Sequence, residues 1–167
     1  MKKTIALTVI VTLVLTGLTL GAVQYVMHGS WKPRPEGTPT AAPEGAEWMN
    51  LLSAEEKAKW VNITDDNDIF AIEGDMLHIF GRSVKLKYAG YTGRTFADFD
   101  LHLEFKVAKR SNSGVFLRVQ KDDPVRRGFE VQVLDDHGAP PNVNGSGAVY
   151  DVVSTMFNLA RPAGEWN

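Results

Sequence analysis

Residues that could do chemistry occupy alternate positions in three short segments of the chain. These segments alternate between apolar and polar residues over residues 99–107, 113–120 and 128–134. A period of two is typical of β-strands that bury one face, so the remaining residues share the opposite face. That opposite face carries His102, Glu104, Phe116, Arg118, Glu130 and Gln132. Carboxylates, an amide, a guanidinium and an imidazole beside an aromatic ring can bind sugar hydroxyls and transfer protons.

Short connections predict that the three strands are antiparallel neighbours. In the register that keeps the apolar residues together, Arg118 lies opposite both His102 and Glu130. The next rung then holds Glu104, Phe116 and Gln132. A shift of two residues would change these partners. The pattern fits two interpretations, a solvated outer face with cross-strand charge pairs or a concave carbohydrate-binding face.

No helical period of any length follows residue 60, which predicts an all-β fold of the two-sheet sandwich kind. Residues 73–76 predict a tight hairpin turn, and residues 112–114 predict another turn. Ser53 followed by Glu56 is typical of the capped start of a short helix.

The composition excludes several classes of protein. A net charge of −2 gives no electrostatic basis for a nucleic-acid partner. Without cysteine the chain has no disulfide, thiolate metal site or lipid-modified cysteine. Its 167 residues are enough for one domain with a hydrophobic core.

Residues 1–27 predict a signal anchor or a signal peptide that exports the rest of the chain. Residues 4–26 carry no charge, which matches the roughly 20 residues of a spanning helix better than the about 7–15 of a signal peptide. The following domain would be secreted, or membrane-anchored and facing the periplasm or cell exterior. Gly17 and Gly21 are spaced as in weakly dimerising helices, although small residues also recur by chance.

A proline- and glycine-rich stretch over residues 28–47 predicts an extended tether. The folded domain is then expected over residues 48–167.

Three stretches of this domain, "NSGVFLRV", "GFEVQVLDD" and "NLARPAGEWN", resemble the 3-keto-disaccharide hydrolase domain family. The resemblance covers about residues 49–167. It implies a concanavalin A-like jelly-roll sandwich, an exported protein and a carbohydrate substrate. Family domains continue with further strands after the "GEWN" stretch, so the sandwich in this chain is expected to be incomplete.

The resemblance also implies a reaction on a glycoside whose carbon 3 is oxidised to a ketone. A base removes the acidified proton on carbon 2, the oxygen on carbon 1 leaves, and water then adds. Glu130 is the expected catalytic carboxylate, with Arg118 and His102 assisting. The expected substrate-binding residues are Gln132, Phe116, Glu104, Asn158 and Trp166. The alternatives are a non-catalytic carbohydrate-binding module and an inactive fragment.

Two further arrangements remain open from the residues alone. Asp135, Asp136 and His137 fit either a divalent metal site or an ordinary turn, so the expected cofactor is none or a divalent metal. Glu130 and Asp135 would suit a retaining glycosidase only if a bulge brought their carboxyls to about 5–5.5 Å. Asn158 and Trp166 fit either a pocket rim or a structural corner.

Overall fold

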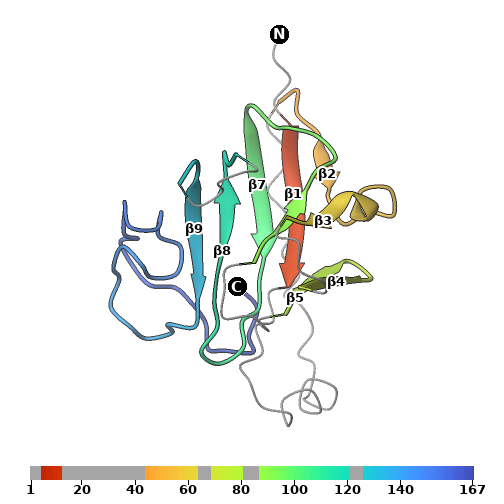
Figure 1. Cartoon of the computed structure of the whole chain (residues 1–167). Coiled ribbons are helices and arrows are strands. Elements are labelled where there is room, and N and C mark those ends of the chain that lie inside the picture. The colour runs from red at the N-terminus through yellow and green to blue at the C-terminus, as the bar shows by residue number, and fades with distance from the viewer. Residues whose placement is uncertain (1–4, 13–43, 64–68, 81–86, 121–125) are drawn as a thin grey trace. The chain divides into compact units, whose positions relative to one another are not determined.

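The computed structural model describes residues 5–12, 44–63, 69–80, 87–120 and 126–167 (Figure 1). Within these ranges the structure is all-β, as predicted, with one short 3-10 helix, η1 (Lys57–Lys59). The chain forms two compact units, one ending at Phe105 and the other containing the described residues from Lys106 onward. Their relative arrangement is not defined, so each is described by itself.

The first unit contains strands β1 to β7. Their bounds are β1 (Ile5–Thr12), β2 (Trp48–Asn50), β3 (Trp60–Asn62), β4 (Phe70–Glu73), β5 (Met76–Ile79), β6 (Ala89–Tyr91) and β7 (Phe99–Glu104). β1 pairs in parallel with β2, β5 and β7, while β3 pairs with β6 in a separate antiparallel ladder. The predicted hairpin is confirmed: β4 and β5 pair antiparallel, with Glu73 opposite Met76 and Gly74 at φ 63°. That left-handed angle favours glycine at the turn.

Strand β1 is extended where the sequence predicted the beginning of a helix. Six of its eight residues are β-branched, and such residues favour a pleated strand over a helix. The rest of the predicted anchor, including Gly17 and Gly21, lies outside the described residues, as do residues 28–43 of the tether. The anchor, the tether and the dimer therefore stay predictions. No helix in the described ranges is long and apolar enough to cross a membrane.

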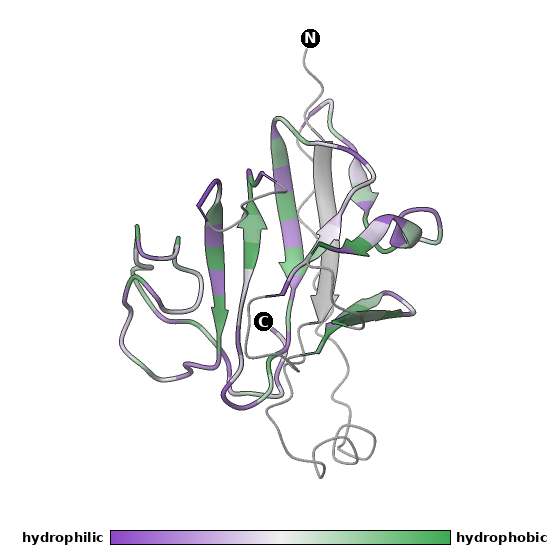
Figure 2. Cartoon of the chain, in the orientation of Figure 1, coloured by the Kyte–Doolittle hydropathy of each residue, from purple (hydrophilic) through white to green (hydrophobic). Residues whose placement is uncertain are grey.

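Hydrophobic side chains build the core of the first unit. Its buried apolar residues are Leu51, Leu52, Ile69 and Leu77. Hydropathy alternates along β7, whereas β4 and β5 are more uniformly apolar (Figure 2). Alternation along β7 is the pattern from which its strand was predicted.

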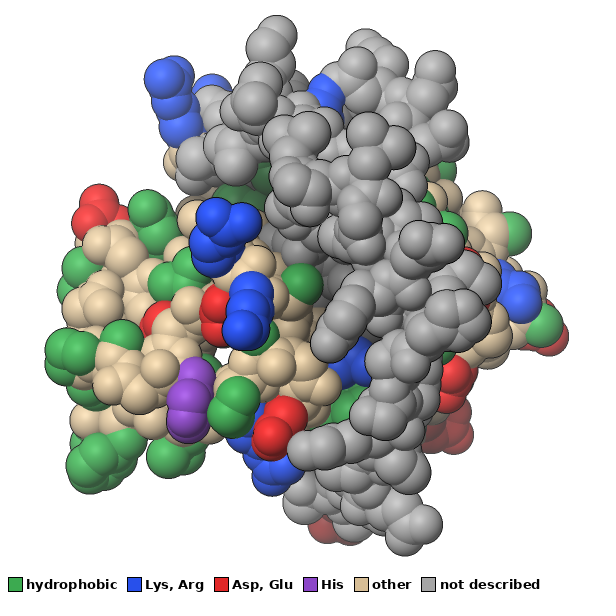
Figure 3. Space-filling view, turned by 90° about the horizontal axis from the view of Figure 1, so that it is seen from below, with side chains coloured by type: hydrophobic (Ala, Val, Ile, Leu, Met, Phe, Trp, Pro, Cys, Tyr) green, Lys and Arg blue, Asp and Glu red, His purple; other side chains and the backbone are tan. Residues whose placement is uncertain are grey.

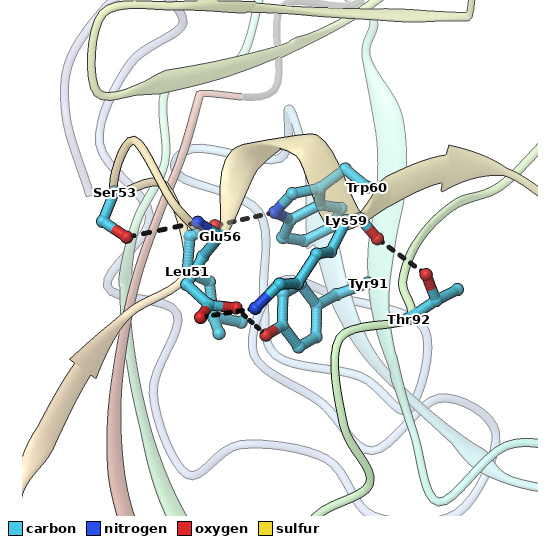
Figure 4. A network of polar contacts seen from close by, with 7 residues as sticks. All are labelled: Leu51, Ser53, Glu56, Lys59, Trp60, Tyr91 and Thr92. Carbon is cyan, nitrogen blue, oxygen red and sulfur yellow. Dashed lines mark hydrogen bonds and ion pairs between the residues drawn. The ribbon is translucent and has the colours of Figure 1, made fainter.

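A polar clamp joins the turn before η1 to strand β6, and Figure 4 shows it from close by. The Glu56 carboxylate accepts hydrogen bonds from the Tyr91 hydroxyl and, at 2.8 Å, from the Lys59 ammonium. The predicted cap is present, because the Glu56 N–H donates to Ser53 Oγ at 3.3 Å. Its helix is reduced to turns and η1. Since Glu56 is only 8% exposed, these donors compensate for removing its carboxylate from water.

The second unit contains strands β8 (Asn112–Leu117) and β9 (Phe129–Leu134), paired antiparallel as predicted. Isolated bridges join Val131 to Val149 and Lys106 to Trp166. The buried apolar residues of this unit are Val107, Val133, Ala148 and Trp166. The predicted turn over residues 112–114 is wrong, because these residues begin β8.

An exposed apolar cluster lies in the segment that follows β9. Its most exposed members are Val152, Val153, Met156, Phe157 and Leu159, the last two at 70% and 85% exposure. Figure 3 shows hydrophobic side chains gathered along the left edge of the view. Large contiguous exposed apolar patches often mark surfaces that bind another molecule. These residues lie outside the strands that the alternation of the sequence predicted.

The clamp gives the first unit a measurable alkaline transition. Burial, together with the hydrogen bond to Glu56, raises the pKa of Tyr91 from 10.0 to about 12. The stabilisation is fully present below about pH 10 and is lost as the pH rises towards about 12. Tyr91→Phe should lower the melting temperature at neutral pH by a few degrees and remove this tyrosine's share of the alkaline loss.

Thermal melts of the full chain between pH 7 and pH 12 would measure both effects. Tyr150→Phe is the matched control, because Tyr150 is 43% exposed. Identical melting curves for Tyr91→Phe and the wild type would contradict the clamp.

Candidate active site

The β8–β9 ladder brings three of the predicted site residues onto one face. Residues opposite each other in an antiparallel pair point to the same side of the sheet. Phe116 lies opposite Glu130, and Gly114 lies opposite Gln132. The expected grouping of Phe116, Glu130 and Gln132 is therefore present, but the register differs from the predicted one by two residues.

Arg118 is not opposite Glu130, and this part of the prediction is wrong. β8 ends at Leu117, which pairs with Phe129. Arg118 follows with a left-handed backbone at φ 57° and is exposed. A left-handed residue cannot continue a strand, so the alternation that the sequence carries through Val119 does not continue in the backbone. A role for Arg118 in catalysis stays a prediction.

The Glu130 side chain lies against the backbone of the neighbouring strand. A Cβ atom built on Gly114 would lie 1.9 Å from Glu130 Oε1 and 2.6 Å from its Cδ. The side chain is half-buried, and this burial raises the pKa of the Glu130 carboxyl above its usual range. A carboxyl with a raised pKa is a stronger base when ionised and a usable acid when protonated.

Gln132 is buried and uses its amide to hold the chain around it. It is 3% exposed. Its Nε2 donates to Asn144 O at 3.2 Å, and its Oε1 accepts from Val133 N at 3.2 Å. The backbone of Gln132 also bonds Gly147 and Ala148. Through these contacts Gln132 anchors the loop after β9, which explains why the side chain is buried. Contact of Gln132 with substrate stays a prediction.

His102 and Glu104 lie on one face of β7, in the first unit. His102 Nε2 is 3.9 Å from Glu104 Oε1, and Glu104 is 6% exposed. Trp48 meets the imidazole edge to face, with 6.4 Å between ring centroids. The expected pairing of His102 with Arg118 would join the two units, so it lies outside what the structure defines.

The Asp-Asp-His segment forms the turn that was one of its two interpretations. Asp135 Oδ2 accepts from Arg110 N at 2.6 Å, and Asp136 Oδ2 accepts from Ser146 N at 2.9 Å. His137 Nδ1 lies 2.7 Å from the oxygen of Ala160. Each side chain thus contacts a different backbone group. In the part of the chain that the structure describes, no group of three or more His, Cys, Asp or Glu side chains could hold a metal ion.

Asn158 also bonds to backbone. Its Nδ2 donates to the carbonyl oxygens of Asp136 and Ala139 at 2.8 Å and 3.2 Å, and its Oδ1 accepts from Ala160 N. Three such bonds fix the turn after β9 against the chain that returns to it. This arrangement corresponds to the structural corner that was one interpretation of this segment.

Trp166 is 3% exposed, and Lys106 Nζ lies over its ring at 5.1 Å from the centroid. Burial lowers the pKa of the Lys106 ammonium. The contact is a cation–π interaction, which holds the ammonium beside the indole. Lys106 was absent from the predicted site, although the alternation of residues 99–107 already places it on the polar face.

Gly114 is the second residue that the sequence analysis missed, because it was assigned to a turn. A glycine inside a strand pattern often marks a place where another group approaches the backbone. In this structure that group is the side chain of Glu130.

Comparison with known proteins identifies the family of this chain. The model of the 3-keto-alpha-glucoside-1,2-lyase-like domain matches residues 44–167. The chain belongs to this family. A 3-keto-disaccharide hydrolase of Bacteroides thetaiotaomicron is 34% identical over 90 residues, which cover 43% of this chain and 31% of that protein. The match therefore spans about a third of the relative's length, and no solved structure matches significantly.

The 3-keto-alpha-glucoside-1,2-lyase-like match includes described residues of both units and every predicted site residue. It confirms the family that the three sequence stretches resemble. The family does not by itself assign a role to any side chain, which the geometry has to supply.

The role of Asn158 can be tested by its stability effect. Asn158→Asp replaces the amide donor with an acceptor that faces two carbonyl oxygens. The loss of such partners typically costs about 1–3 kcal/mol, so the melting temperature of the full chain should fall. Asn112→Asp, at an exposed amide of β8, is the control and should change stability by less than about 0.5 kcal/mol. Equal melting temperatures for the two variants would show that Asn158 does not hold the turn.

Proposed function

We propose that this domain acts in the cleavage of 3-keto-glycosides, with Glu130 as the general base. The observation that carries the proposal is the half-buried Glu130 carboxyl, whose pKa burial raises. Family membership and the name of the Bacteroides relative support the choice of substrate. A binding surface alone does not require a carboxyl with a raised pKa.

The reaction begins with the proton on carbon 2 of the sugar, which the ketone on carbon 3 makes acidic. The Glu130 carboxylate takes this proton, and negative charge develops on the ketone oxygen. The carbonyl on carbon 3 then re-forms, and the electron pair released from the C2–H bond forms a double bond between carbons 1 and 2. The C1–O bond breaks at the same time, and its electron pair leaves with the oxygen, which takes a proton. Addition of water across that double bond, with hydroxyl on carbon 1 and hydrogen on carbon 2, completes a net hydrolysis.

A cation near the ketone oxygen would stabilise the developing charge. Lys106 is our first candidate, because it is a half-buried ammonium held over Trp166. Its lowered pKa also makes its proton easier to transfer to the leaving oxygen. Arg118 and His102, named from the sequence, are the further candidates for these two steps.

The remaining expectations form part of the same proposal. The whole domain would be a concanavalin A-like jelly-roll sandwich that binds a carbohydrate substrate. The N-terminal segment would direct its export, either as a membrane-anchored or as a secreted protein. The hydrophobicity of residues 4–26 supports this location.

Substitution of the proposed base tests the function. Glu130→Gln should lower the turnover of a 3-keto-glycoside by roughly 10²–10⁴-fold, because the amide cannot accept the proton. The dissociation constant for the same glycoside should change little, since the side chain keeps its shape. In the wild type, kcat should rise with pH through a pKa above the usual carboxyl range, because the base works when ionised.

Glu55→Gln is the control, because Glu55 is an exposed carboxylate of the first unit. Steady-state assays and calorimetric titration of the full chain would supply both constants. Binding without turnover by the wild type would instead identify a carbohydrate-binding module. Full turnover by Glu130→Gln would remove Glu130 from the mechanism.

A further inference from the structure

We propose that Gly114 is a positioning residue, whose lack of a side chain provides the space that the Glu130 carboxyl occupies. The inference deepens the proposed function and rests on it for the catalytic role of Glu130. Its geometric part concerns only the two strands of the second unit.

The space above Gly114 is filled by Glu130. The three heavy atoms nearest to a Cβ built on Gly114 all belong to this glutamate, namely Oε1 at 1.9 Å, Cγ at 2.5 Å and Cδ at 2.6 Å. Real Cβ atoms essentially never approach another heavy atom closer than 3.0 Å. Any other residue at position 114 would therefore require the Glu130 side chain to move.

Backbone conformation does not explain this glycine. The glycines with a left-handed backbone in the described ranges are Gly45, Gly74, Gly138, Gly147 and Gly164. Gly114 is not among them and lies within the regular ladder of β8. A glycine inside a strand weakens that strand relative to alanine, so the space above Gly114 remains as the physical reason for this glycine.

The ladder explains why the carboxyl lies at this position. Gln132 lies opposite Gly114, and its amide is held by the backbone of Asn144 and Val133. Phe116 lies directly opposite Glu130. The glutamate therefore extends diagonally across the sheet, between an aromatic residue and a fixed amide, where the missing Cβ leaves room. Diagonal neighbours in a sheet are within reach of a long side chain.

A methyl group at position 114 would displace the carboxyl rather than break the fold. The atoms in conflict, from Cγ outward, all belong to one side chain that can rotate about its Cα–Cβ bond, whereas no backbone atom is among the three nearest. The glutamate would rotate towards water, where its charged form is better solvated. The site would then lose a correctly placed base while the ladder stayed intact.

The test is Gly114→Ala in the full chain, measured in two ways. A pH titration of the Glu130 carboxyl by carbon-13 NMR, assigned by comparison with Glu130→Gln, should give a lower pKa than in the wild type. The kcat for a 3-keto-glycoside should fall by about 10²-fold, the loss typical of a displaced catalytic group, with KM little changed. Ser113→Ala, on the opposite face of the same strand, should change neither quantity.

The dependence on Glu130 distinguishes positioning from a general structural effect. In a Glu130→Gln background, Gly114→Ala should cause no further loss of kcat. A further loss of several fold, or an unchanged carboxyl pKa in Gly114→Ala, would overturn the inference. If the wild type shows no turnover, the proposed function fails, while the titration still decides the position of the carboxyl.

A variant that does not fold would also be informative. If Gly114→Ala alone failed to fold, Gly114→Ala combined with Glu130→Ala should fold, because no long side chain would remain to collide with the new methyl group. Failure of this double variant to fold would show that the space is needed for something other than Glu130.

Discussion

The placement of one carboxyl group against a glycine backbone is the constraint on which the proposed chemistry of the second unit depends. The register of β8 and β9 puts Gly114 diagonally beside Glu130 and Phe116 opposite it. A register shifted by two residues would give the carboxyl different neighbours. Because the group is half-buried there, its pKa is raised. Strand pairing thus determines both where the proposed base lies and how strong it is.

Several polar side chains around this strand pair form hydrogen bonds with the backbone. Gln132, Asp135, Asp136 and Asn158 all bond to main-chain groups of the turns and loops near β9. Buried polar groups need such partners, since an unmade hydrogen bond costs more than a typical one contributes. Residue types that suit sugar binding or metal ligation are equally suited to this task. The presence of these residue types in a sequence is therefore weak evidence for a functional site.

The sequence predicted the elements of the fold better than their pairing. Alternation predicted the segments that form β7, β8 and β9, and the Gly74 turn predicted the β4–β5 hairpin, because both signals are local. β8 ends before a left-handed backbone at Arg118 and pairs with β9 two residues away from the predicted register, and no hydrophobic period reveals either feature. The strand at residues 5–12 was not predicted, because the uncharged run over residues 4–26 has the length of a membrane helix and was weighed above the β-branched residues that favour a strand.

The candidate site was predicted in part for the same reasons. The common face of Phe116, Glu130 and Gln132 follows from a period of two, which pairing preserves even when the register shifts by two. The special place of Gly114 depends on atoms of another strand, and a strand glycine alone does not reveal them. The cation–π contact of Lys106 depends on Trp166, which is sixty residues away in the sequence. Contacts of this kind become visible only in the folded chain.

The most direct test of the central claim is the fate of the hydrogen on carbon 2. The full chain would be incubated with a 3-keto-glycoside in D₂O, and the released sugar analysed by NMR at early times, with free 3-keto sugar as the exchange control. Removal of this proton by a base predicts deuterium on carbon 2 of the product at a level above the control. Release of a sugar that keeps its original hydrogen there would contradict the account.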